Sequence, residues 1–117
     1  MKTQKFILRP SEATTTAKTE VGDWFDISDY SELYAWLNVT AFAARVDETL
    51  TVTIEREADN TAGYTTILAF DVINVTGAQS QEALALLFIG GRIRVRCVTA
   101  GTWTAKSITY SVKCYVK

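Results

Sequence analysis

The stretch RIRVRCV, residues 92–98, alternates between arginine and apolar side chains. Successive side chains of a β-strand point to opposite faces, so Ile93, Val95 and Cys97 share one face and the arginines share the other. A strand that is apolar on one side buries that side against a second layer. The stretch therefore predicts an all-β fold in which two sheets pack face to face.

The same alternation recurs on both sides of this stretch. Residues 48–57, ETLTVTIERE, place Leu50, Val52 and Ile54 on one face and threonines on the other. Residues 107–117, SITYSVKCYVK, turn five side chains inward: Ile108, Tyr110, Val112, Cys114 and Val116. Because Gly101 lies between this strand and strand 92–98, the two are predicted to form a hairpin. Both cysteines then lie on core faces, which predicts free buried thiols.

Residues 31–45, SELYAWLNVTAFAAR, form a predicted strand that is nonpolar on both faces. One face carries Leu33, Ala35, Leu37, Val39 and Ala41, and the other carries Tyr34, Trp36 and Phe42. A two-layer sandwich needs only one of these faces for its core. Three bare aromatic side chains in one row would invite association. Tyr34, Trp36 and Phe42 therefore either lie under a loop or arm or meet another protein chain. Because the polar stretch 10–20 is too poor in apolar groups to cover them, we predict that they contact another chain.

Together the patterns predict a single-domain antiparallel two-sheet β-sandwich over residues 1–117, jelly-roll-like, with about seven or eight strands. Residues 80–88, SQEALALLF, are rich in helix formers and predict at most one short helical turn. Residues 10–20, PSEATTTAKTE, are the most polar stretch and predict an arm or an edge segment.

Composition argues against an enzyme. The 117 residues include no histidine, so no triad that uses imidazole can form, and there is no phosphate-binding loop motif. We expect no catalytic residue, no metal and no cofactor. Twelve basic and thirteen acidic residues give a net charge of −1, which argues against nucleic acid as a partner. No apolar run is long enough to cross a bilayer, so no membrane partner is expected.

The arginine row, Arg92, Arg94 and Arg96, has three possible interpretations. It is a solvated strand face beside cross-strand carboxylates, a basic strip that docks on an acidic protein surface, or a nucleic-acid site. The last is disfavoured by the net charge and because no aromatic residue interleaves the arginines to stack bases.

Two further groups of residues also allow two interpretations each. The acidic stretch DWFDISDYSE, residues 23–32, either supplies oxygen ligands for Ca²⁺ or is a polar connection whose carboxylates cap turns. The three tryptophans either pack in the core or form a platform for sugars. Trp103 lies in or beside a predicted loop, which makes it the candidate glycan contact.

Three segments resemble small β-sandwich structural proteins of tailed bacteriophages: residues 25–41, 49–77 and 90–117. The matches to that family's pattern are Asp26, Ser28, Tyr30, Leu33, Gly91, Arg92, Arg94, Val95, Gly101, Thr109, Tyr110, Ser111 and Val112. The middle segment departs from it, because Asn60 follows Asp59 where the family has glycine, and Tyr64 stands where it has tryptophan.

The resemblance implies a non-enzymatic virion protein, made in the bacterial host cytoplasm, that decorates or cements the head shell. Its partner would be the major capsid protein or another virion protein. A homo-oligomer is expected, with a trimer favoured because trimers match local three-fold positions of a shell. The alternatives are a neck, tail or fibre-base component, and a carbohydrate-binding β-sandwich module.

Overall fold

Two antiparallel β-sheets make up the computed structural model, which describes residues 3–43, 46–57, 63–86 and 91–117. Within these ranges there are nine strands and no helix. The strands are β1 (Gln4–Thr14), β2 (Lys18–Val21), β3 (Phe25–Asp26), β4 (Glu32–Ala43), β5 (Thr49–Glu57), β6 (Tyr64–Ala69), β7 (Gln79–Leu86), β8 (Arg92–Ala100) and β9 (Ser107–Val116). None of the described segments is a helix that could span a bilayer.

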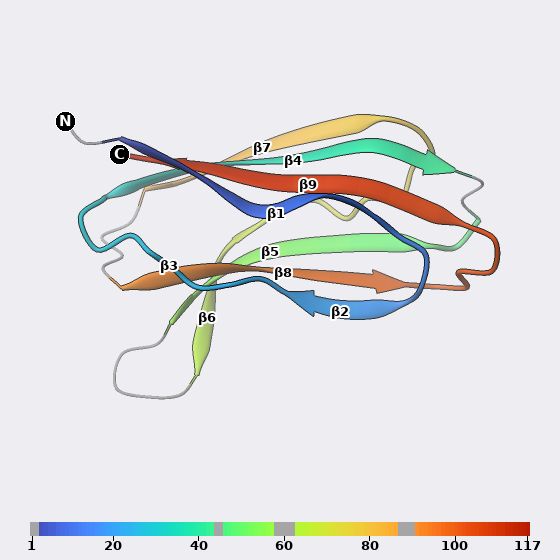
Figure 1. The fold of residues 1–117 in the computed structure, drawn as a ribbon, viewed down its shortest axis with the longest axis horizontal. Coiled ribbons are helices and arrows are strands. Elements are labelled where there is room, and N and C mark those ends of the chain that lie inside the picture. Colours follow the sequence, from blue (N-terminus) through green and yellow to red (C-terminus); the bar gives the residue numbers. More distant parts are fainter. Residues whose placement is uncertain (1–2, 44–45, 58–62, 87–90) are drawn as a thin grey trace.

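The chain crosses repeatedly from one sheet to the other. Sheet A has the order β1-β9-β4-β7, and sheet B has the order β2-β8-β5-β6, with β3 also paired to β8. Among the described strands, β5 and β6 are the only consecutive pair that is hydrogen-bonded together. This alternation between two layers is the jelly-roll arrangement, and both layers are visible in Figure 1. The predicted all-β sandwich is confirmed.

The predicted hairpin between strand 92–98 and strand 107–117 is wrong. β8 pairs with β5 in sheet B, whereas β9 pairs with β1 and β4 in sheet A. Gly101 does turn the chain, with a φ of +105°. A Cβ at this position would lie 2.8 Å from the Cα of Glu48, so the turn packs tightly against the connection before β5. A glycine turn permits either outcome, and the long-range pairings decide between them.

The predicted helical turn at residues 80–88 is also wrong where the structure describes it. Residues 79–86 form β7, which pairs with β4 and places Glu82 opposite Trp36 and Leu84 opposite Tyr34. Helix propensity is a weak preference that tertiary pairing overrides. Residues 87 and 88 lie outside the described ranges.

The core lies between the two sheets and follows the predicted alternation over most of its length. The inward side chains of β5, β8 and β9 are buried: Leu50, Val52, Ile54, Ile93, Val95, Cys97, Ile108, Tyr110, Val112, Cys114 and Val116. Both cysteines are free and buried, as predicted. The polar segment 10–20 spans the end of β1 and most of β2, which lie at the edges of sheets A and B.

One extra residue in β4 changes which side chains face the core. Val39 pairs with Tyr110 and Ala41 pairs with Thr109, so Thr40 is inserted relative to β9. Such a bulge reverses the alternation beyond it. Phe42 is therefore only 2% exposed, and Ala41 is exposed instead. The prediction that Phe42 shares the outer face with Tyr34 and Trp36 is wrong.

Trp103 completes the core at the end of the sandwich where Phe42 turns inward. The two rings are stacked, with centroids 5.9 Å apart and planes 3° from parallel. The indole N–H of Trp103 donates to the carbonyl oxygen of Ala100 at 3.0 Å. The prediction that Trp103 is the exposed tryptophan is therefore wrong, since it is 9% exposed.

A buried arginine joins the two sheets at their open edge. Bulges in β1 turn Arg9 inward, and its guanidinium lies 3.6 Å from the ring centroid of Tyr110. Its Nε donates to Glu20 on β2 at 3.1 Å, and its Nη2 donates to Thr14 at 3.1 Å. The charge is buried, but it is paired and its donors are used, which is the condition for burying a cation.

We predict that both thiols are unreactive in the native protein. Burial raises the pKa of Cys97 to about 11 and that of Cys114 to about 12, so neither forms the reactive thiolate at neutral pH. A thiol-titrating reagent should report no fast reaction in buffer and two thiols per chain in denaturant without reductant. Finding no free thiol after denaturation would contradict this.

We also predict a specific acid dependence of stability at the Phe42 end. Glu48 is fully buried, pairs with Lys106 and accepts hydrogen bonds from the N–H groups of Val46 and Asp47. Burial alone would raise the pKa of Glu48, but the hydrogen bonds from Lys106 and Val46 outweigh it and hold the pKa at about 2. Because this pKa is below the unfolded value, the stabilisation is present above about pH 4.3 and is lost as pH falls toward 2.

The test compares Glu48→Gln with wild type by urea unfolding at several pH values. The variant should have the lower midpoint at neutral pH, and the difference should shrink from about pH 4.3 downward. Glu12→Gln, at an exposed position of β1, is the matched control and should change little. A Glu48→Gln deficit that is independent of pH would show that the carboxylate charge is not what matters.

Candidate functional site

Two rows of side chains cross the outer face of sheet A in register. The first row is Lys5, Tyr115, Tyr34 and Leu84, which are direct neighbours on β1, β9, β4 and β7. The second row is Ile7, Lys113, Trp36 and Glu82 on the same four strands. We call these eight residues the aromatic surface. It combines aromatic and aliphatic groups with charges of both signs.

The rest of the same face is different in character. In the next row β9, β4 and β7 carry Ser111, Asn38 and Ser80, which are small and polar. Beyond that row, the Thr40 insertion turns Phe42 into the core. The aromatic surface is therefore confined to the half of the sheet near the start of β1 and the end of β9 (Figure 1).

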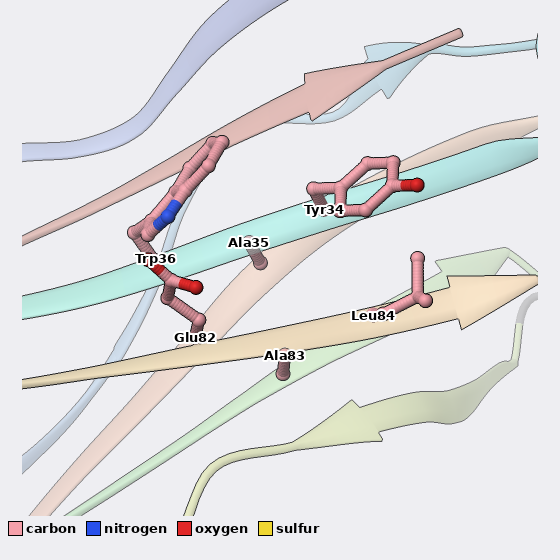
Figure 2. Close-up of a pocket in the computed structure, with 6 residues that line it drawn as sticks. All are labelled: Tyr34, Ala35, Trp36, Glu82, Ala83 and Leu84. Carbon is pink, nitrogen blue, oxygen red and sulfur yellow. The ribbon is translucent and has the colours of Figure 1, made fainter.

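The aromatic surface is exposed and hollowed around Trp36. Ile7 is 58% exposed and Leu84 is 50% exposed, while Tyr34 and Trp36 are half-buried. Figure 2 shows Tyr34 and Trp36 standing on β4 beside Glu82 and Leu84 on β7, where they line a hollow of about 210 Å³. Trp36 also borders a second hollow, of about 440 Å³, on the side of Ile7 and Lys113. Such hollows flanking an aromatic anchor suit interdigitation with another surface.

The charges on the aromatic surface are available for an external partner. Among the described residues, Lys5, Lys113 and Glu82 have no ion-pair partner. By contrast, Lys117 at the rim is engaged, because its Nζ lies 3.4 Å from Glu32 and 5.4 Å from the Tyr34 ring. The hydrogen bond with Glu32 raises the pKa of Lys117. The rings of Tyr34 and Tyr115 lie 6.2 Å apart in a tilted arrangement.

The arginine row lies on the outer face of sheet B, where carboxylates already neutralise most of its charge. Arg94 and Arg96 both donate to Glu55, at 3.0 and 2.9 Å, and Glu55 is only 1% exposed. Arg92 makes a two-bonded contact with Glu57 at 2.7 Å. These hydrogen bonds raise the pKa of Arg92 and Arg96.

Two aromatic rings cover the same arginines. The Arg94 guanidinium lies 4.4 Å from the ring centroid of Trp24 and 5.0 Å from that of Tyr64. Arg96 lies 4.8 Å from Tyr64. No aromatic residue lies between the arginines in the sequence, but aromatic rings from other segments do lie over them in the structure. The inference that the arginines lack aromatic neighbours is therefore wrong. Since most of the charge of the arginine row and the flat faces of Arg94 and Arg96 are engaged within the chain, the row is left out of the candidate site.

The acidic stretch 23–32 does not converge on one point. Asp26 accepts hydrogen bonds from the N–H and hydroxyl of Ser28, which lower the pKa of Asp26. Glu32 points instead to Lys117. Within the described ranges no three cysteine or acidic side chains are grouped so that they could hold a metal ion. The hydrogen bonds from Ser28 to Asp26 are those of a carboxylate that caps a turn, which is what the polar-connection interpretation describes.

Sequence reasoning finds two residues of the aromatic surface and misses the others. Tyr34 and Trp36 are predictable from one strand alone. The others lie on β1, β7 and β9 and reach the surface only through pairing. Lys113 and Tyr115 do carry a signal, because the alternation of residues 107–117 puts both on the outward face. The three tryptophans have three different environments: Trp36 is on the aromatic surface, Trp24 covers arginines and Trp103 is in the core.

Comparisons with known proteins show the fold. No protein-family model matches the sequence, and no curated protein matches it closely. A chain from the structure of infectious bursal disease virus, Gx strain, is similar over 98% of this chain, with a TM-score of 0.64 at 12% identity. VP2 of that virus, in a subviral particle, is similar over 98%, with a TM-score of 0.54 at 13% identity.

An adhesin domain shares the fold as well. The K3 cleaved adhesin domain of Lys-gingipain from Porphyromonas gingivalis W83 is similar over 89% of this chain and 66% of its own, with a TM-score of 0.50 at 13% identity. This chain spans about a third of the length of the viral chains, namely 31% and 32%. At these identities the likeness is one of fold, and the fold it shows is a β-sandwich.

Proposed function

We propose that this chain is a non-enzymatic structural protein of a virion that acts through a protein contact at the aromatic surface. The observation that carries the proposal is an exposed, hollowed aromatic surface on a sandwich similar to viral chains over 98% of its length. Surfaces rich in exposed aromatic and aliphatic groups mark protein interaction sites. The sequence resemblance to tailed-phage head proteins specifies the role as a capsid decoration or cement protein.

The chemistry of the chain supports binding without catalysis. There is no histidine, and burial raises the pKa of both thiols far above neutral. A decoration protein needs no reaction, because a ligand that binds only the assembled shell stabilises it by mass action. The partner would be the major capsid protein or another copy of this chain in the virion.

The alternatives differ in what they require. A neck, tail or fibre-base component would use the same surface in far fewer copies per particle. The carbohydrate-binding alternative loses the residue on which it depends, because Trp103 is stacked on Phe42 in the core. A glycan site would have to use Trp36 and Tyr34 instead.

The first test is to quantify the chain in purified particles of the phage that encodes it. We expect a copy number of the same order as that of the coat protein. A few copies per particle would favour the neck or tail alternative. Complete absence from particles would contradict a virion role.

The second test asks whether the aromatic surface makes the contact. The double variant Tyr34→Ser/Trp36→Ser should fold, because both side chains are half-exposed, but it should be lost from particles. Central aromatic anchors contribute about 2 kcal/mol or more each. Tyr64→Ser, at an exposed tyrosine on sheet B, is the matched control and should still be incorporated. Incorporation of the double variant at the wild-type level would show that this surface is not the contact.

A further prediction is that the arginine row does not bind nucleic acid. Its arginines are paired with Glu55 and Glu57 and covered by Trp24 and Tyr64, so phosphates would have to displace existing partners. Anisotropy titration with DNA and RNA at low salt should show no tight binding. Tight, steeply salt-dependent binding that is abolished by Arg92→Ala/Arg94→Ala/Arg96→Ala would contradict this.

A further inference from the structure

The aromatic surface has a symmetry that a general docking surface would not need. In the second row Lys113 lies on one side of Trp36 and Glu82 lies on the other, each one strand away. In the first row Tyr115 and Leu84 flank Tyr34 in the same way. Opposite charges in one row, and an aromatic and an aliphatic side chain in the other, are thus placed on either side of β4.

Consider a two-fold axis that runs parallel to β4, just above the outer face of sheet A. Such an axis would bring these flanking side chains of two copies together. Rotation about this axis places β9 of one copy over β7 of the other and keeps each row facing its own counterpart. Lys113 of each copy then faces Glu82 of the other, and Tyr115 faces Leu84. An isologous contact is defined by this reciprocity, in which residue i meets j and j meets i.

The spacing of packed sheets suits this arrangement. Strands lie about 4.8 Å apart within a sheet, which puts Lys113 and Glu82 about 10 Å apart in one chain, with Trp36 between them. Sheets that pack face to face lie about 10 Å apart and keep their strands within about 30°. An extended lysine and glutamate can meet across that distance, and the hollows beside Trp36 can receive the indole of the other copy.

The charges also argue for a second copy over a uniformly charged partner. An acidic surface would meet Lys113 favourably but Glu82 unfavourably, and a basic surface would do the reverse. Neither side chain has an ion-pair partner among the described residues, and both are exposed. A second copy supplies the opposite charge at both positions.

We propose that the aromatic surface is the interface of a two-fold homodimer, with reciprocal Lys113–Glu82 ion pairs on either side of facing Trp36 side chains. The inference rests on the proposed function only in taking this surface to be a protein contact, and it names a second copy as the partner. At this contact it replaces the trimer expected from the sequence, since a three-fold ring needs a heterologous contact.

The experiment is sedimentation equilibrium of the wild type and of two charge reversals, Lys113→Glu and Glu82→Lys. The wild type should be a dimer in the micromolar range. Each single variant places like charges at both reciprocal positions, so its dimer dissociation constant should rise about tenfold or more. Lys18→Glu, at an exposed position on sheet B, is the control and should leave dimerisation unchanged.

The decisive measurement is an equimolar mixture of the two single variants. In a mixed dimer the glutamate introduced by Lys113→Glu in one chain meets the lysine introduced by Glu82→Lys in the other. The unchanged Glu82 and Lys113 meet at the reciprocal position, so both ion pairs are restored. The mixture should form dimers with nearly wild-type affinity while each variant alone stays dissociated. A monomeric or trimeric wild type, single variants that dimerise normally, or a mixture that stays dissociated would each overturn the proposal.

The particle assay separates this inference from the proposed function. If the wild type is a monomer but the Tyr34→Ser/Trp36→Ser variant is lost from particles, the surface binds another virion protein and the homodimer is wrong. If the mixture restores dimers but the chain is absent from particles, the homodimer stands and the virion role falls. Binding of monomeric wild type, but not of that variant, to a glycan array would assign the surface to carbohydrate and overturn both.

Discussion

The register between β4 and β9 is the constraint on which most of the molecule depends. β9 and β4 are the two central strands of sheet A. Their register aligns the two cross-strand rows and leaves Thr40 as an extra residue between Val39 and Ala41. Before the insertion β4 turns Tyr34 and Trp36 outward, and after it the strand turns Phe42 onto Trp103. One residue thus divides a nonpolar strand into a surface half and a core half, because a shift of one residue exchanges the faces of a strand.

The outer faces of sheets A and B differ in how far their charged side chains are paired within the chain. On sheet B, Glu55 and Glu57 pair with the arginines, and Trp24 and Tyr64 lie over the guanidinium groups, so most of this charge is engaged within the chain. On sheet A, Trp36 stands between hollows, and Lys113 and Glu82 have no ion-pair partner among the described residues. Exposed apolar groups gathered on one face, as here, are what the proposed protein contact would use.

This contrast ties the fold to the proposed role. The sandwich holds β1, β9, β4 and β7 in one sheet, so side chains from four distant segments form a single surface. Arg9 is buried between the sheets, where it contacts Glu20 and Tyr110 and so holds β1 against its neighbours. Lys5 and Ile7 lie on the same strand. A rigid scaffold of this kind suits the proposed role, in which the protein works by fitting against another.

The all-β class, the inward faces of β5, β8 and β9, the buried thiols and the outward placement of Tyr34 and Trp36 could be predicted from the sequence. These follow from the two-residue period of a strand, which is a local property. Tertiary structure alone decided that β8 and β9 lie in different sheets, that residues 79–86 form a strand, and that Phe42 and Trp103 belong to the core. It also decided that Trp24 and Tyr64 cover the arginines and that Lys113 and Glu82 flank Trp36. Those outcomes depend on which strands pair and in what register, and long-range pairing leaves no mark on a single strand's pattern.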